Sequence, residues 1–392
     1  MSKAFFTERW ALAAMAAAIA LAACWQASRV QAAGNRGGGY AMCSDQSEWA
    51  PCESGQCELG PCDMGQCELG QCDMGACCDD AACSKCCSPW GHCTSVWGEF
   101  LFLHPTGADM VHAQQQDGIG GAGTVPFGQI GVTDPHHEPG YRVGGNLALS
   151  NCSSISLSYT FFESDSRSRV NAPIIPGGGG AVGSLVHHPG AAITASAGPV
   201  DAEYYVDFQL GDVEYRRLLF GDNYGWMNYS VGARYAHLDQ EFDQAGIFAG
   251  GATGLIHTST DVEFDGGGAM FGLDGERRFG RRGLSLYGNV GVSPIVGQFS
   301  SIYTLTNETT DQLLTEARWK DDRFVTIVDF EIGVAWTSRN KLWRVSSGYT
   351  ASFWYNTVTT PTFVDAVQAN NYVDIGDTLA FDGVTTRLER RF

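Results

Sequence analysis

The side chains of this chain alternate, residue by residue, between two chemical characters over most of its length. The clearest run is 154–161, in which Ile155, Leu157, Tyr159 and Phe161 alternate with serines and a threonine. A period of two places the two sets on opposite faces of a strand. When nearly every strand of a long chain has this two-sided character, the pattern predicts a closed barrel with one face toward lipid and the other toward a polar lumen.

Ten segments carry strand-like alternation, and they cover most of 95–392. They are 96–102, 141–150, 154–161, 203–218, 224–238, 258–278, 283–293, 323–338, 342–357 and 378–392. The segments 295–306 or 311–320 would supply two more. We therefore expect an all-β fold over 95–392, a transmembrane antiparallel β-barrel of roughly 10–12 strands, because single-chain barrels of this kind have even strand numbers.

The connections between these segments differ in length. Short polar turns are expected at Gly221-Asp222-Asn223 and at Arg339-Asn340-Lys341. The segments 104–139, 164–202 and 239–257 are rich in Gly, Pro or His, and we expect long loops there. Alternation of short turns with long loops is typical of outer-membrane barrels.

A soluble β-sandwich would show similar alternation, with one face of each strand buried against a second sheet. Three features favour a membrane barrel over a sandwich: an export signal at residues 1–32, the terminal Phe392 and the aromatic strand ends, such as Trp336, Trp343 and Trp354. Trp and Tyr concentrate at bilayer interfaces because one end of the ring is apolar and the other tolerates water.

Residues 1–32 resemble a signal peptide. Lys3 and Arg9 precede an Ala-rich apolar run that ends at Cys24 and is too short to span a bilayer. Two interpretations remain open. Val30-Gln31-Ala32 fits cleavage before Ala33, whereas the residues before Cys24 resemble a lipobox, in which Cys24 would be lipidated.

A cysteine-rich tether, 33–94, follows the signal and holds 12 of the 14 cysteines. Six of them recur every five residues, and the first five begin the pattern Cys-acid-x-Gly-x: Cys52, Cys57, Cys62, Cys67, Cys72 and Cys77. Frequent Gly disfavours a helix, so we expect turns or disorder. Outside the cytoplasm, disulfides within the tether or to envelope partners are favoured. Metal binding by thiolates and a repeat without a fixed role are the alternatives.

Composition excludes several classes of function. The formal net charge of −19 argues against nucleic acid as a partner, because phosphate binding needs clustered Lys and Arg. We find no catalytic motif, and we assign no catalytic residue, metal site or cofactor. An enzyme inside a barrel would need a cluster of residues that periodicity does not reveal.

Several short motifs occur in a fixed order along the chain: Glu138-Pro139-Gly140-Tyr141-Arg142-Val143-Gly144, Leu157 to Phe162, Gly272-Leu273-Asp274, Leu284 to Asn289, Val296-Gly297, Val328 to Gly333, Gly348 to Asn356 and Phe381 to Arg387. In sequence and in order they resemble motifs of the Legionella-type major outer-membrane protein family. This resemblance implies a pore-forming barrel of the bacterial outer membrane, with outer-membrane lipid and the barrel-assembly machinery as partners. Phe392 is the expected assembly signal, although Arg390 stands where such signals usually carry an apolar residue.

The function expected from this resemblance is porin-like diffusion of small hydrophilic solutes or ions. Polar residues of the strands are the candidates for the lumen: Arg142, Asn146, Asp207, Gln209, Arg234, Asp329 and Glu331. Their charges would set selectivity. The alternative is a structural envelope protein, anchored by its barrel and cross-linked through the tether.

Overall fold

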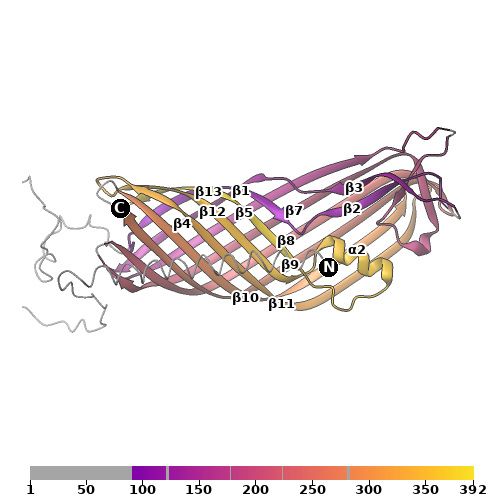
Figure 1. Cartoon of the computed structure of the whole chain (residues 1–392). Coiled ribbons are helices and arrows are strands. Elements are labelled where there is room, and N and C mark those ends of the chain that lie inside the picture. Colours follow the sequence, from indigo (N-terminus) through magenta and orange to yellow (C-terminus); the bar gives the residue numbers. More distant parts are fainter. Residues whose placement is uncertain (1–90, 121–122, 177, 223, 280–282) are drawn as a thin grey trace, which may run out of the picture.

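The structure is a computed structural model that describes residues 91–120, 123–176, 178–222, 224–279 and 283–392 (Figure 1). The elements run in the order β1 (Ser95–Thr106), β2 (Met110–Gln116), β3 (Pro126–Thr133), β4 (Glu138–Ser150), β5 (Ser153–Val170), β6 (Ala181–Ser184), η1 (Pro189–Ala191), β7 (Ile193–Gly221), β8 (Gly225–Gly250), β9 (Gly254–Phe279), β10 (Leu284–Asn307), β11 (Gln312–Thr337), β12 (Trp343–Thr357), α2 (Thr360–Ala369) and β13 (Asp377–Arg391). The predicted signal peptide, Cys24 and the six repeat cysteines lie outside the described residues.

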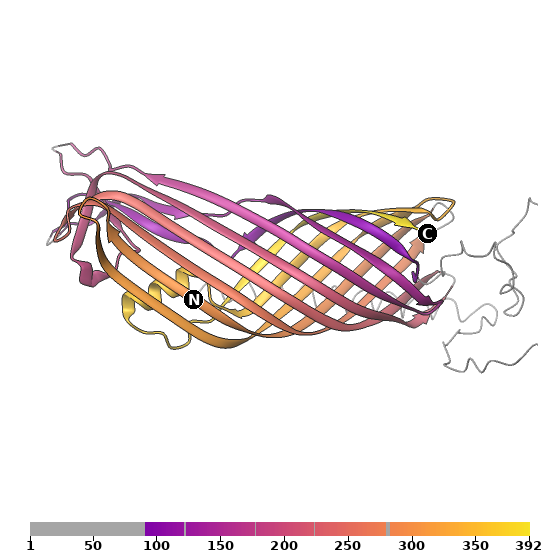
Figure 2. The ribbon, with the colours of Figure 1, turned by 180° about the vertical axis from the view of Figure 1, so that it is seen from behind.

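Ten of the strands close into a ring. Its order is β1-β4-β5-β7-β8-β9-β10-β11-β12-β13, and β13 pairs again with β1. Every neighbouring pair is antiparallel, and the strands are tilted against the long axis of the barrel (Figure 2). The predicted barrel is confirmed. The segments 295–306 and 311–320 add no strands, because they continue β10 and β11.

The prediction of three long loops is wrong in large part. The segment 104–139 contains β2 and β3, 164–202 contains β6 and the ends of β5 and β7, and 239–257 is mostly β8 and β9. The parts of β5, β7 and β8 in these segments keep the period of two, and their charged residues face outward. Their polar composition therefore looked like that of loops.

The two faces of the barrel wall exchange character along each long strand. In β7, Asp212, Glu214 and Arg216 point inward while the apolar Val213 and Tyr215 point outward. A polar interior with an apolar exterior is the arrangement that a bilayer requires.

Earlier in β7, nearer its N-terminal end, the arrangement is reversed. Tyr204, Val206 and Phe208 point inward and are buried, whereas Glu203 and Asp207 point outward. A polar exterior around an apolar interior is typical of a strand in water. Strand β7 therefore leaves the membrane between these two stretches, and the barrel projects well beyond the bilayer.

Outward-facing tyrosines mark the level at which the exterior changes. Their hydroxyls donate hydrogen bonds to polar side chains in the next row of the wall: Tyr159 to Gln209 at 2.8 Å, Tyr235 to Asp265 at 2.6 Å, and Tyr349 to Asp382. At the other edge of the apolar band, Trp336 and Trp343 are exposed beside the β11–β12 turn. Aromatic girdles of this kind flank the lipid-facing band of outer-membrane barrels.

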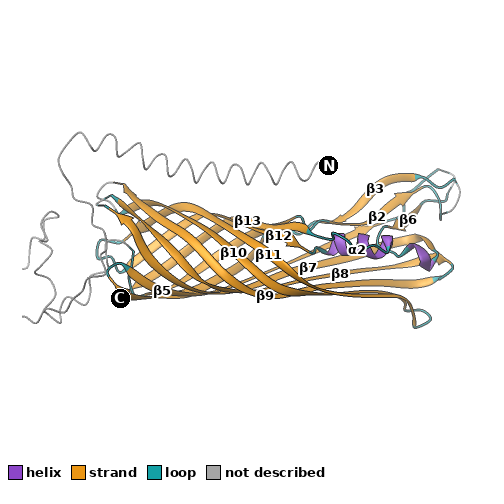
Figure 3. Ribbon diagram, turned by 90° about the horizontal axis from the view of Figure 1, so that it is seen from below, coloured by secondary structure: helices purple, strands orange, loops and turns teal. Residues whose placement is uncertain are grey.

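Short turns lie at the end of the barrel that carries the C-terminus (Figure 2). Outer-membrane barrels place their short turns in the periplasm and their longer connections outside. The opposite end, with β2, β3, β6 and α2, is therefore extracellular (Figure 3).

The helix α2 was not predicted from the sequence. It begins after Thr359 with Pro361 in its first turn, and its buried face includes Phe363, Val364 and Val367. Pro is well suited to the first turn of a helix because its missing N–H has no intrahelical partner there. Within the described residues, no helix is long and apolar enough to cross a membrane.

Candidate functional site

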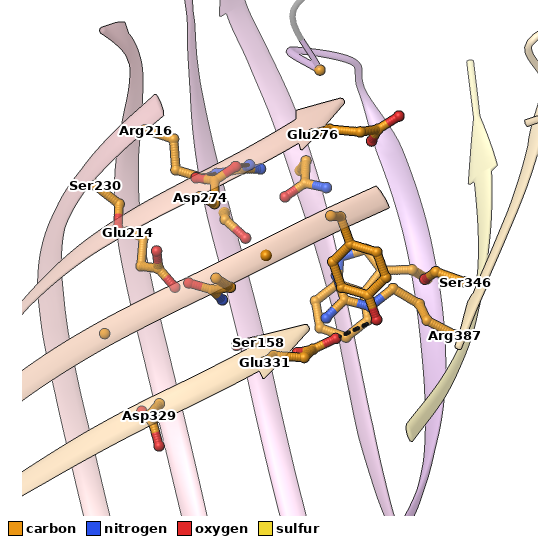
Figure 4. A pocket seen from close by; sticks show the side chains of 18 of the residues that line it. Ser158, Glu214, Arg216, Ser230, Asp274, Glu276, Asp329, Glu331, Ser346 and Arg387 are labelled. Atoms are coloured by element: carbon orange, nitrogen blue, oxygen red, sulfur yellow. Dashed lines mark hydrogen bonds and ion pairs between the residues drawn. The ribbon is translucent and has the colours of Figure 1, made fainter. Parts of the chain in front are cut away.

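A polar cavity of about 160 Å³ occupies the membrane-spanning part of the lumen (Figure 4). Charged side chains from seven strands meet around it: Arg142, Asp212, Glu214, Arg216, Arg234, Asp274, Glu276, Asp329, Glu331, Arg344, Arg387, Glu389 and Arg391. Every cation of this set is an arginine. The guanidinium is a rigid fork of donors that pairs with carboxylates at two points, so it forms fixed ion pairs better than lysine does.

Glu99 of β1 lies at the centre of one group of ion pairs. Its side chain is 0% exposed. Its Oε2 accepts hydrogen bonds from Nε and Nη2 of Arg387 at 2.9 and 2.7 Å, and Arg142 Nη1 lies 3.6 Å away. The Arg387 guanidinium also stacks 4.0 Å from the ring centroid of Trp97. A buried carboxylate is tolerated here because two cations and the hydrogen bonds compensate for its lost hydration.

Ion pairs also cross the lumen. Arg142 Nη1 on β4 lies 3.8 Å from Glu331 Oε2 on β11, and these strands are four steps apart in the ring. Arg344 Nη2 on β12 lies 3.1 Å from Glu276 Oε2 on β9. Contacts of this kind fill the cross-section and hold distant parts of the wall together.

Among the ion pairs of the cavity, those of Arg234 on β8 lie farthest from the periplasm. Its Nε and Nη2 donate to the two carboxylate oxygens of Asp212 at 2.7 and 3.1 Å, and its Nη1 pairs with Asp329 of β11. The contact is bidentate and nearly free of solvent, so it fixes the arginine side chain in one orientation.

Glycines in the wall make room for Tyr287, which extends from β10 across two strands. A methyl group at Gly333 would lie 2.8 Å from its ring, and one at Gly348 would lie 2.6 Å from its hydroxyl oxygen. The Tyr287 hydroxyl then donates to Glu331 Oε1 at 2.7 Å. The absence of side chains at these glycines therefore positions a member of the ion-pair network.

Five of the seven predicted lumen residues line the cavity. They are Arg142, Asn146, Arg234, Asp329 and Glu331. Four belong to the ion pairs, and Asn146 donates to Ser95 Oγ at 3.0 Å. Their assignment to a conducting pore stays a proposal.

The prediction that Asp207 and Gln209 face the lumen is wrong. Gln209 lies on the outer face, where its side chain accepts a hydrogen bond from the Tyr159 hydroxyl. Asp207, two residues earlier in the strand, points the same way. The two faces have exchanged character at this level, so polarity no longer indicates the lumen. Parity counted from Asp212 would have placed both residues outside.

Sequence reasoning missed much of the network. The residues not singled out include Glu99, Asp212, Asp274, Glu276, Arg344, Arg387 and Glu389. Each lies an even number of residues from another lumen residue of its own strand, as Glu389 does from Arg387. That parity, together with the face of the strand on which the neighbouring aromatic residues lie, is the sequence signal that could have identified these residues.

An apolar layer fills the lumen on the extracellular side of the cavity. We give this name to Leu101, Phe162, Phe208, Ile327, Trp354 and Phe381, which are all buried. Phe208 of β7 lies across the ring from β12 and β13, yet its ring centroid is 5.9 Å from that of Trp354 and 4.5 Å from that of Phe381. Side chains from opposite walls thus meet in the middle.

Four carboxylates face outward in one row just beyond the tyrosine girdle. Glu163 is opposite Asp207, Asp207 is opposite Asp239, and Asp239 is opposite Glu263. Like charges directly opposite each other destabilise a sheet. Partial burial and then the charge of Asp239 raise the pKa of Asp207 to about 6.

Replacing Asp207 with Asn is expected to stabilise the barrel at pH 7.5. The pKa of Asp207 is raised from 3.8 to about 6 in the folded state, so folding favours the protonated form. Its ionisation costs stability progressively as the pH rises from about 4 through 6, and the cost persists above that. Because the side chain is partly exposed, we expect a gain of about 0.5 kcal/mol, smaller in high salt.

Denaturant unfolding of the detergent-solubilised protein at pH 7.5 and pH 4 checks this prediction, and the gain should vanish at pH 4. Asp201→Asn on the same strand is the matched control. Its carboxylate pairs with Arg169 at 3.5 Å, so its loss should bring no gain. An equal gain from both variants would show that the acidic row is not the cause.

Comparison with a family model agrees with this fold. A family model described as "Legionella pneumophila major outer membrane protein precursor" matches residues 93–388. A search of curated proteins gave no match. The chain is similar to the solved outer membrane protease OmpT from Escherichia coli, with 10% identity and a TM-score of 0.42 over 76% of this chain and 97% of that one.

Two further solved structures are more distant. The transport unit of the autotransporter AIDA-I from Escherichia coli has 8% identity and a TM-score of 0.27, over 76% of this chain and 90% of that one. A Pseudomonas aeruginosa FadL homologue has 9% identity and a TM-score of 0.20, over 76% and 89%. The family match covers most of the chain and nearly all of the barrel. The protein is a β-barrel of the bacterial outer membrane and belongs to the Legionella pneumophila major outer membrane protein family.

Proposed function

We propose that the protein is a closed structural barrel, which anchors the N-terminal cysteine-rich segment to the outer membrane and displays its extracellular half at the cell surface. The observation that carries this proposal is the apolar layer, because Phe208, Trp354 and Phe381 meet across the lumen. Hydrated ions and polar solutes do not pass through a packed apolar layer, since desolvation costs several kcal/mol or more.

The ion pairs of the cavity support the same conclusion. Arg142 and Arg344 reach carboxylates on distant strands, so the charges of the lumen face one another and not a water-filled channel. The barrels of porins are also larger, with 16–18 strands around an aqueous channel, whereas small barrels are filled by side chains.

Porin-like diffusion is the second candidate, and the polar cavity in the membrane-spanning half favours it. Asn289 faces this cavity and keeps an exposed side chain. Small hydrophilic solutes would pass if the apolar layer parted, and the five predicted residues that line the cavity would then line part of the path. This function requires a second conformation of the barrel.

The anchoring role predicts covalent partners for the tether. Envelopes of the native organism, resolved on non-reducing gels, should contain high-mass species that collapse to the monomer on reduction. A chain in which the eleven cysteines of residues 33–90 are replaced by serine should lack these species while its barrel still shows heat-modifiable mobility. Identical non-reducing and reducing gels for the native chain would refute cross-linking through the tether.

A further inference from the structure

Residues 91–94 precede β1 and lie at the periplasmic end of the barrel. Although they belong to no strand, His92 is 2% exposed and Cys93 is 3% exposed. A terminal approach to a strand is ordinarily solvated, because its backbone has no ladder partner. The burial shows that these residues lie within the periplasmic mouth.

The contacts of this segment lead from one side of the mouth to the other. The Thr94 carbonyl accepts a hydrogen bond from the Phe392 amide at 2.9 Å, next to the start of β1. The Ala148 amide, at the end of β4, donates to Thr94 Oγ1 at 3.3 Å. His92 Nδ1 then lies 3.0 Å from Ser154 Oγ on β5.

The far end of the segment reaches β8. A methyl group at Gly91 would lie 2.9 Å from Cζ2 of Trp226, so the backbone lies directly against the indole ring. Gly91 also has φ of +83°, a conformation that favours glycine. Strand β8 is four steps from β1 in a ring of ten, so the segment crosses most of the mouth.

We propose that Gly91–Thr94 is a strap that closes the periplasmic mouth of the polar cavity. Gly91 and Trp226 both line that cavity, so the strap forms part of its boundary. The strap is the last part of the cysteine-rich tether, 33–94. Whatever holds or pulls the tether in the periplasm therefore acts on the mouth, and the cavity opens when the strap leaves Trp226. This inference is independent of whether the barrel conducts.

Hydrogen exchange of the full chain in detergent tests whether the strap is seated. The amides of residues 91–94 should exchange at least tenfold more slowly than those of an unstructured peptide. His92→Ala and Trp226→Ala, each confirmed as folded by heat-modifiable mobility, should remove that protection, while peptides from β10 stay unchanged. Exchange of 91–94 in the native chain at the rate of an unstructured peptide would overturn the proposal.

Access to the cavity provides the second measurement. Asn289→Cys places a thiol in the cavity, and its reaction with a small cationic methanethiosulfonate reagent is followed by mass spectrometry of the peptide that contains residue 289. We expect at least a tenfold faster reaction when His92→Ala or Trp226→Ala is added. Gln298→Cys, which lies on the outer face, is the control and should react equally in all backgrounds. Unchanged reactivity at position 289 in both variants would show that 91–94 does not close the mouth.

Discussion

Arg387→Met is expected to lower the free energy of unfolding by about 3–5 kcal/mol, because removing one partner of a buried ion pair leaves the other charge uncompensated. The uncompensated group is Glu99, whose side chain is 0% exposed and whose Oε2 accepts both hydrogen bonds from Arg387. Arg142 remains 3.6 Å from Glu99, so the loss should stop short of complete unfolding. Equilibrium unfolding of the protein in detergent with guanidinium chloride measures the change.

Two further variants isolate the cause. Glu99→Gln in the Arg387→Met background removes the buried charge and should recover a substantial part of the stability. Arg318→Met is the matched control, because Arg318 is 70% exposed, and it should change stability by less than about 0.5 kcal/mol. A loss of less than about 1 kcal/mol for Arg387→Met would mean that water already reaches Glu99.

Phe208→Ala should cost about 3–5 kcal/mol, the range for truncation of a buried aromatic side chain with a cavity left behind. Phe208 is 3% exposed, and its ring centroid lies within 6 Å of those of Phe162, Trp354 and Phe381. These neighbours come from different parts of the wall, which the strand ladders hold in place, so they have little freedom to fill the gap.

The same unfolding measurement checks this loss, with Ile247→Ala as its control. Ile247 is 67% exposed on the outer face of β8, and its truncation should change stability by less than about 0.5 kcal/mol. If the two truncations were equally costly, the apolar layer would not be the packed core of the extracellular half.

The barrel itself could be predicted from the sequence because its signal is local. The alternation of Ile155, Leu157 and Tyr159 with serines requires only the period of a strand. The glycines of the family motifs are also visible in the sequence. Their physical role, such as the space that Gly333 and Gly348 leave for Tyr287, depends on neighbours that sequence spacing does not reveal.

The site could be predicted only in part, because assigning a residue to the lumen requires the level at which the strand leaves the membrane. Asp329 and Glu331 lie in the lipid-spanned half, where a polar side chain indicates the lumen. Asp207 lies beyond that level, where the same polarity indicates the exterior. The polarity of one residue does not distinguish the two halves of a strand; its parity relative to a known lumen residue is needed as well. The partners of Arg142 on distant strands follow from ring closure alone.

Single-channel recording in planar bilayers is the most direct test of the closed barrel. The folded native chain, with insertion verified by protease protection, should give no conductance steps, because the apolar layer seals the lumen. Regular steps from the native chain, with the amplitude of a water-filled pore, would contradict the account and establish porin-like diffusion in its place.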